Sequence, residues 1–146
     1  GGFNAHAVAN TLWALSHVCE APHPSFLPVL EGRGVAEAGR FTPQGVASTF
    51  GAFARMGILP SPALSSALQR RAEAEMGGFG MPAVASLLSS MAKGGVKPQG
   101  GLLAAVEGRA LAGVGDMDRV AVCKIMWAYA TMGAPPGEAL REALLR

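Results

Sequence analysis

The chain is built on an internal repeat with a 38-residue period. Blocks that begin at Phe3, Phe41, Phe79 and Met117 align with one another without a gap. Residues of one type recur in phase, among them Val8, Val46, Val84 and Val122, and Pro22, Pro60, Pro98 and Pro136. A period of this length is typical of repeat proteins, in which each unit buries its apolar face against the next unit. The sequence therefore predicts one helical-repeat domain over residues 1–146, with repeats at 3–40, 41–78, 79–116 and 117–146.

The first half of each block has the pattern of an amphipathic helix. It begins at a residue that favours the N-cap position, namely Asn4, Thr42, Gly80 or Asp118. Apolar residues then follow at spacings of four and three, which places them on one helical face. They are Val8, Leu12 and Leu15; Val46, Phe50 and Phe53; Val84, Leu88 and Met91; and Val122, Met126 and Tyr129. We expect the helix to end where Gly57, Gly95 or Gly133 can turn left-handed, with Cys19 in the equivalent place.

The second half of each block predicts a second helix. Pro24 and Pro62 fit its first turn, where a missing N–H costs nothing. Its apolar residues are Phe26 and Leu30; Leu64, Leu68 and Ala72; and Leu102, Val106 and Ala110. It is expected to end at Gly39, Gly77 or Gly115. No segment alternates with period two, so we predict an all-α, right-handed solenoid of stacked 38-residue helix-turn-helix repeats, with seven or eight helices.

Composition excludes several other classes of protein. Charged residues make up 15% of the chain and the net charge is +2, so there is no polybasic arm. Cys19 and Cys123 are too far apart in the sequence to indicate a disulfide framework or zinc site, and we expect both to be buried. The uncharged stretches contain polar residues, glycines or proline, and no membrane span is predicted.

No enzymatic motif is present. His6, His17 and His23 come from one block and have no carboxylate in phase with them. Ser65–Ser66 and Ser89–Ser90 have no nearby base that could activate a hydroxyl. We expect no catalysis, no cofactor, no metal and no small-molecule substrate.

The chain does not begin with Met, and its fourth block stops before a full repeat is complete. We expect it to be part of a longer solenoid and to be only marginally stable alone. In particular, Leu140, Leu144 and Leu145 are expected to be poorly covered, because each repeat in a solenoid contacts only its neighbours.

Two strings resemble a known helical repeat. FNAHAVANTLWALSHV (3–18) and FTPQGVASTFGAFARMG (41–57) are similar to the first helix of the octotricopeptide repeat, a 38-residue helical hairpin. The triplets at 13–15 and 127–129, Trp-Ala-Leu and Trp-Ala-Tyr, match the aromatic-Ala-apolar segment of that family. The third block departs from it, with Leu-Ser-Ser-Met at 88–91. Related repeats occur in FAST kinase-like and RAP-type proteins.

The resemblance implies an organellar RNA-binding protein, in the mitochondrion or the chloroplast, with a transit peptide outside this sequence. Such a protein acts in RNA maturation, stability, translation or ribosome assembly. The partners that the resemblance implies are single-stranded RNA and other protein subunits of an organellar assembly.

A repeat protein that recognises an RNA sequence needs side chains that vary from repeat to repeat on a constant scaffold. Three rows on one face of the first helix vary in this way: His6, Gln44, Pro82 and Val120; Asn10, Ser48, Ser86 and Lys124; and His17, Arg55, Lys93 and Thr131. The candidates for contact with bases are His6, Asn10, Gln44, Ser48, Ser86 and Lys124, and Arg55 and Lys93 suit phosphates. An ordinary solvated surface also varies, so both interpretations remain open.

Other residues are given structural roles. Trp13 and Trp127 could stack on bases, but we predict that they are buried between neighbouring hairpins. Arg33, Arg71 and Arg109 could follow an RNA backbone, but Glu37 and Glu75 are placed to pair with the first two. The alternative to RNA binding is a protein-interaction scaffold, which the low charged fraction favours.

Overall fold

The computed structural model describes residues 4–18 and 26–146, and these residues contain only helices, turns and loops. The α-helices are α1 (Ala5–His17), α2 (Phe26–Ala36), α3 (Pro43–Met56), α4 (Pro62–Ala74), α5 (Met81–Gly94), α6 (Leu102–Ala112), α7 (Arg119–Met132) and α8 (Glu138–Leu144). Short 3-10 helices follow α2, α4 and α6, at Ala38–Arg40, Met76–Gly78 and Val114–Asp116. The described residues contain no strand, so the all-α prediction is confirmed.

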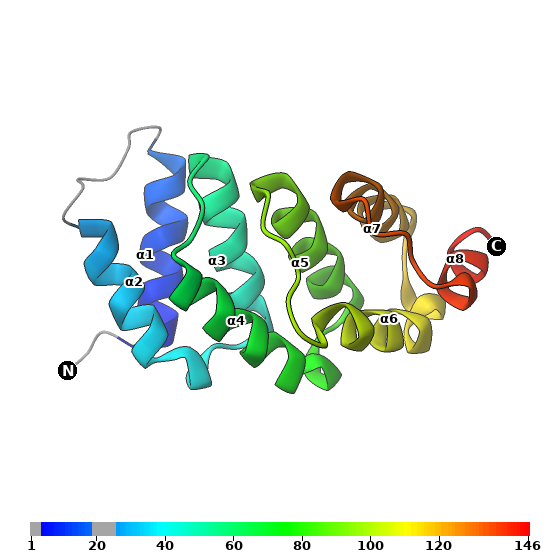
Figure 1. Cartoon of the computed structure of the whole chain (residues 1–146), viewed down its shortest axis with the longest axis horizontal. Coiled ribbons are helices and arrows are strands. Elements are labelled where there is room, and N and C mark those ends of the chain that lie inside the picture. The colour runs from blue at the N-terminus through cyan, green and yellow to red at the C-terminus, as the bar shows by residue number, and fades with distance from the viewer. Residues whose placement is uncertain (1–3, 19–25) are drawn as a thin grey trace.

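The helices form two layers (Figure 1). In one layer α1, α3, α5 and α7 lie side by side in chain order, and this is called the odd layer. In the other layer, the even layer, α2 contacts α4, α4 contacts α6, and α6 contacts α8. None of the described helices combines the length and the apolar character needed to cross a membrane.

The odd helices begin and end where the sequence predicts. Side chains cap three of them: Asn4, Thr42 and Asp118 accept hydrogen bonds from the backbone N–H three residues later, at 2.9, 3.0 and 2.7 Å. Gly57, Gly95 and Gly133 follow α3, α5 and α7 with φ of 70°, 73° and 67°. This left-handed conformation suits glycine, which has no Cβ to clash with the backbone. Cys19, Pro22, His23 and Pro24 lie outside the described residues.

The even helices end earlier than predicted. They stop at Ala36, Ala74 and Ala112, and not at Gly39, Gly77 and Gly115. The chain then tightens into the 3-10 helices, in which an N–H donates three residues back, as from Gly78 to the carbonyl of Glu75 at 2.9 Å. This turn delivers Phe41 and Phe79 into the core, where both are buried.

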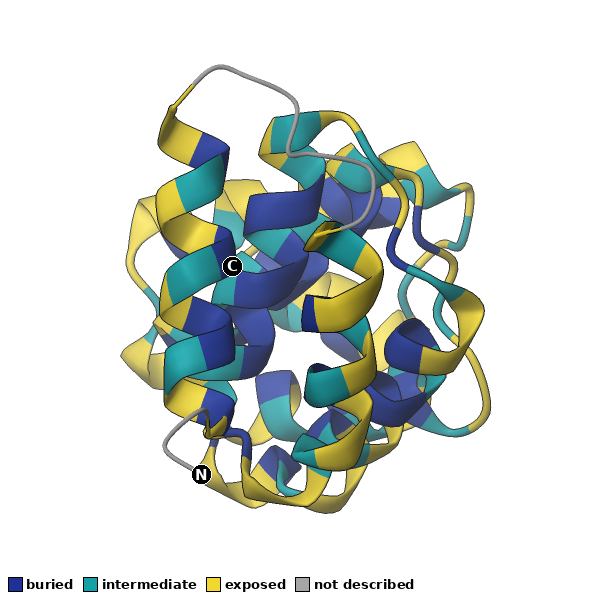
Figure 2. Cartoon of the chain, turned by 90° about the vertical axis from the view of Figure 1, so that its left-hand side faces the viewer, coloured by how far each residue is buried: buried dark blue, intermediate teal, exposed yellow. Residues whose placement is uncertain are grey.

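The core lies between the two layers and between successive odd helices (Figure 2). In α3 and α5 every residue of the expected apolar face is buried, from Val46, Phe50 and Phe53 to Val84, Leu88 and Met91. In α7 the prediction is wrong for Met126, which is 37% exposed, and for Cys123, which is also exposed. Among the described helices, α7 packs on one odd helix, α5, whereas α3 and α5 each pack between two odd helices.

Two expectations for the even layer are also wrong. Phe26 was expected in the core but is exposed, because α2 is the first helix of its layer and packs on α4 from one side only. Leu140 and Leu144 were expected to be poorly covered but are buried, because α8 packs against α6. Leu145, beyond the end of α8, is exposed as expected.

The arginine series has a structural role within the molecule. Arg71 Nε donates to the carbonyl of Phe41 at 2.9 Å, and Arg109 Nε donates to the carbonyl of Phe79 at 2.8 Å. Arg71 also pairs with Glu75 at 2.9 Å, as Arg33 does with Glu37. Arg71 therefore holds α4 to the chain just before α3, and Arg109 holds α6 to the chain just before α5.

Candidate nucleic-acid interface

Negative charge is segregated between the two layers, whereas cations lie in both. The odd helices contain no Asp or Glu, but they carry four cations: Arg55, Lys93, Arg119 and Lys124. None of the four forms an ion pair with another described residue. A face that carries cations without carboxylates attracts anions more strongly than the net charge of the chain implies.

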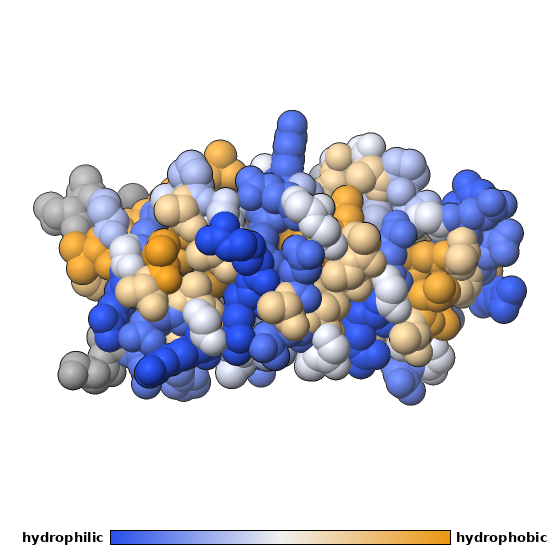
Figure 3. All heavy atoms as spheres, turned by 60° about the horizontal axis from the view of Figure 1, so that its bottom comes forward, coloured by the Kyte–Doolittle hydropathy of each residue, from blue (hydrophilic) through white to orange (hydrophobic). Residues whose placement is uncertain are grey.

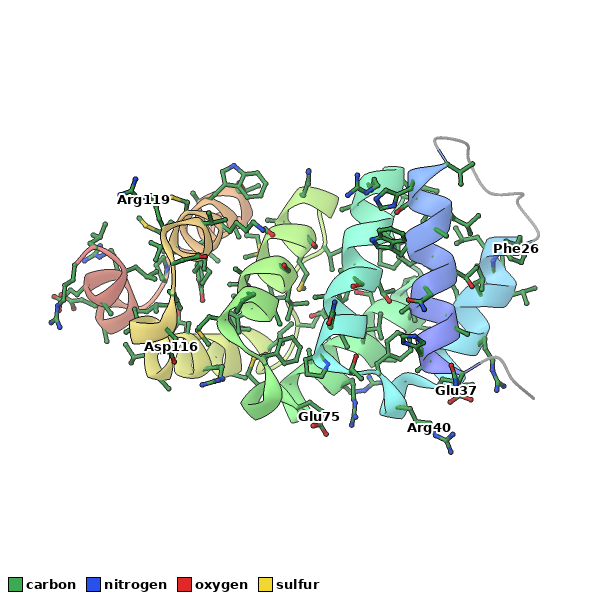
Figure 4. All side chains as sticks on the ribbon, turned by 180° about the vertical axis from the view of Figure 1, so that it is seen from behind. Phe26, Glu37, Arg40, Glu75, Asp116 and Arg119 are labelled. Carbon is green, nitrogen blue, oxygen red and sulfur yellow. The ribbon has the colours of Figure 1, made fainter. Side chains whose placement is uncertain are left out.

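The described carboxylates all lie in the even helices or in the joints that follow them. In Figure 4 the labelled Glu37, Glu75 and Asp116 lie along one edge of the molecule, and Arg119 lies at the opposite edge. Figure 3 brings the lower side of Figure 1 forward and shows strongly hydrophilic side chains with apolar patches between them. The even side therefore carries charges of both signs, together with exposed apolar side chains such as Phe26, Val29 and Leu111.

The outer surface of the odd layer is hollowed into a trough. Its central hollow, of about 530 Å³, is lined by α1, α3 and α5, with Trp13, Ser48 and Arg55 among its residues. A second hollow between α1 and α3 shares Trp13 and Ser48 with it. A third, between α3, α5 and α7, shares Arg55. Neighbouring hollows share lining residues and follow one another across all four odd helices, and together they are called the trough.

The trough brings together all the residues that the sequence proposes for RNA. These are His6, Asn10, Gln44, Ser48, Arg55, Ser86, Lys93 and Lys124. They come from four helices and reach one surface because each helix presents the same face outward. The other members of the three rows differ: Pro82 also lines the central hollow, Val120 lines a small side hollow near the start of α7, and His17 and Thr131 are exposed.

Most of the polar groups in the trough are free to bind. The side chains of Gln44, Ser48 and Ser86 have no hydrogen-bond partner among the described residues. Asn10 Nδ2 lies 3.0 Å from His6 Nε2, so these two exposed side chains hold each other in place. Carboxylates line only a small side hollow near the start of α7, where Asp116 and Asp118 face Lys124.

The two tryptophans are exposed, which corrects the prediction that they are buried. Trp13 is 53% exposed and Trp127 is 49% exposed. The physical reason is helical phase: Trp13 follows Asn10 by three residues and Trp127 follows Lys124 by three, so each lies on the outward face with the polar rows. Both were named from the sequence as side chains that could stack on bases, but burial was predicted because of their size.

The described residues contain no group of three or more His, Cys, Asp and Glu that could hold a metal ion. The side chains that line the trough supply hydroxyl, amide, imidazole, indole and cationic groups. These groups can hydrogen-bond, stack and neutralise negative charge. No protein-family model matches the chain, and no curated protein matches its sequence.

Proposed function

We propose that this chain is an organellar RNA-binding protein of the octotricopeptide-repeat type, which holds single-stranded RNA along the trough. The observation that carries the proposal is the segregation of charge. Four unpaired cations and no carboxylate lie on the odd helices, and the trough runs along that layer. The net charge of +2 is too small to favour RNA by itself, but this distribution concentrates positive potential where a strand would lie.

The proposal includes a solenoid built from four consecutive repeats. Equal spacing supports it: the N-caps Asn4, Thr42, Gly80 and Asp118 recur with the period of the sequence, and so do the terminal glycines Gly57, Gly95 and Gly133. Successive odd helices and successive even helices also contact each other in chain order. In such a stack each repeat presents the same outward face, which gives one set of contacts per repeat.

The residues of the trough divide by chemistry. Arg55 and Lys93 lie in the last turns of α3 and α5 and are assigned to phosphates, since cations bind the RNA backbone without regard to sequence. Asn10, Ser48, Ser86 and Lys124 lie earlier on the same faces and are assigned to base edges, together with His6 and Gln44. Location in the mitochondrion or chloroplast rests on the resemblance, and crosslinking with sequencing in the organelle would identify the bound RNA.

A protein-interaction scaffold is the second candidate. It is favoured by exposed apolar side chains on α7, where Val120 is 59% exposed and Met126 37%. Such side chains are typical of the desolvated centre of a protein interface.

Salt-dependent RNA binding tests the first candidate against the second. We would measure the anisotropy of a labelled, unstructured RNA at several salt concentrations, with the parent chain and with Arg55→Gln and Lys93→Gln. Each substitution should weaken all RNA sequences alike and reduce the slope of log K against log salt by about 0.7. Arg70→Gln is the matched control, because Arg70 is exposed on α4 outside the trough. Absence of binding, or equal effects of all three substitutions, would leave the scaffold as the better explanation.

A further inference from the structure

Trp13 and Trp127 lie at the two ends of the trough. Trp13 lines the two hollows at the α1 end, and Trp127 lines the hollow at the α7 end. They are the only tryptophans of the chain. About half of each side chain is open to solvent, although indole is among the costliest side chains to leave in water.

The two indoles are exposed because of their position within the repeat, and not because α1 and α7 lie at the ends of the odd layer. The same place in the two middle repeats, one period after Trp13 and one period before Trp127, is occupied by Gly51 and Ser89. Both of these are partly exposed although α3 and α5 have odd helices on either side. This position therefore faces the trough in every repeat, with an aromatic ring at each end and small residues between.

The small residues keep the middle of the trough open. A Cβ at Gly51 would come within 3.3 Å of Ser90 Oγ, so a larger side chain here would press on α5. Ala47, Ala52 and Ala83 line the same hollow. These small side chains leave room for a ligand on the floor of the trough between the two indoles.

The surroundings of the indoles indicate the chemistry of the ligand. The hollow that contains Trp127 is also lined by Arg55, Lys93 and Lys124. An apolar protein surface laid on this site would desolvate three cations that have no ion-pair partner among the described residues, which is unfavourable. A nucleotide satisfies both features, because its base stacks on the ring and its phosphate accepts from the cations.

The two hollows that contain Trp13 are lined by Arg55 and Arg40, and here the indole also has a neighbouring ring. The ring of His17 lies against its indole, with the centroids 4.1 Å apart and the planes tilted by 37°. His17 Nδ1 is also 2.8 Å from the carbonyl oxygen of Trp13. One side of the indole is thus supported by a neighbour of its own helix, which limits its motion and prepares a rigid platform for a base.

From these observations we infer that Trp13 and Trp127 each stack on one base of a single-stranded RNA and fix where the strand begins and ends along the trough. This inference rests on the proposed function. Stacking accepts any base, so the pair would set position and the polar rows would set sequence. Three helix-to-helix steps of about 8–10 Å separate the rings, and at one base per repeat the shortest RNA that engages both has about four nucleotides.

Indole fluorescence tests the inference directly. Trp13→Phe and Trp127→Phe each leave one tryptophan as the only indole reporter. We would titrate both proteins with oligouridylates of two, four and eight nucleotides and follow binding of the same RNAs by anisotropy. Both indoles should be quenched by the longer RNAs in step with binding, while the dinucleotide should quench both weakly. A duplex of the same length should leave the emission unchanged, because its bases are already stacked.

Affinity gives a second measurement. Trp13→Ala and Trp127→Ala should each weaken binding of the eight-nucleotide RNA roughly 5- to 150-fold without changing the salt slope. Phe26→Ala is the matched control, since Phe26 is an exposed aromatic residue on α2, away from the trough (Figure 4), and should have no effect.

The possible failures are distinguishable. If RNA binds with the expected salt dependence but neither indole is quenched and both alanine variants keep their affinity, stacking is wrong and RNA binding stands. If the parent chain binds no RNA, the proposed function fails and this inference fails with it.

Discussion

The side-chain Oε1 of Gln69 accepts a hydrogen bond of 2.7 Å from the backbone N–H of Gln99, thirty residues later in the chain. Gln69 is buried in α4, and its Nε2 also donates to Ser65 Oγ at 3.0 Å and to the carbonyl of Lys97 at 3.2 Å. Gln99 lies in the loop that leads into α6. One side chain thus joins an even helix to the chain that enters the next even helix.

The same link recurs in the other blocks. Glu31 Oε2 accepts from the N–H of Ser61 at 2.7 Å, and Glu107 Oε1 accepts from the N–H of Gly137 at 2.8 Å. The acceptors are one repeat period apart, and so are the donors. These bonds join successive even helices, which contact one another less extensively than successive odd helices do.

Gln69→Ala should lower the free energy of unfolding by about 2–3 kcal/mol. The substitution removes three hydrogen bonds made by a buried side chain, and each such bond contributes about 0.5–1.5 kcal/mol net. Gln44→Ala is the control, because Gln44 is exposed and has no partner among the described residues, and it should stay within about 0.5 kcal/mol of the parent. Urea denaturation measures both, and equal effects would show that the link contributes nothing.

Two glycines should respond in opposite directions to the same substitution. Gly95→Ala should cost about 1–2 kcal/mol, because φ is +73° there and a Cβ is strained in this conformation although space is available. Gly108→Ala should instead stabilise by about 0.5–1 kcal/mol, since Gly108 lies inside α6 with open space around it. Thermal unfolding of the two variants gives the comparison, and a loss of stability at Gly108 would contradict the assignment of that position to a regular helix.

Tyr129 should make the protein sensitive to alkaline pH. Burial, together with the charge of Glu107, raises the pKa of its phenol above the usual value of 10.0. A group whose pKa is raised by folding contributes its full stability below pH 10.0, and this contribution is lost as the pH rises further, because the unfolded chain releases the proton first. Tyr129→Phe should therefore unfold less readily than the parent at high pH.

The same variant should keep its stability at neutral pH, since the Tyr129 hydroxyl is buried with no partner among the described residues. Tyr129 is the only tyrosine of the chain, so the ultraviolet absorbance of phenolate follows this residue alone. Ionisation near the usual pKa of 10.0 in the folded protein would show that the side chain is not enclosed as described.

Asn10→Ser should change which base is preferred at one position of the bound RNA, because an amide and a hydroxyl present different donors and acceptors to a base edge. The salt slope should stay unchanged, since no charge is removed. Selection from a randomised RNA pool measures the preference. Asn4→Ser makes the same substitution outside the trough, and serine still caps α1, so its preference should match that of the parent. An unchanged preference in Asn10→Ser would mean that this row does not read bases.

Much of the fold follows from local sequence. Asn4, Thr42 and Asp118 mark helix starts because their side chains satisfy N–H groups only three residues away. The link between Gln69 and Gln99 could not be found in this way. The acceptor row of Glu31, Gln69 and Glu107 has the repeat period, but its partners are backbone N–H groups, which carry no sequence signature.

The sequence alone determined the period, the helix starts, the terminal glycines of the odd helices and the outward phase of the three polar rows, because each depends on residues within one or two helical turns. The tertiary structure decided what those faces meet. It exposed Cys123 and Met126 on α7, buried Leu140 and Leu144 beneath α6, and joined the outward faces of four helices into one trough. Whether an apolar residue at these positions is buried depends on which helix packs beside its own. That contact joins residues far apart in the chain, and local periodicity cannot predict it.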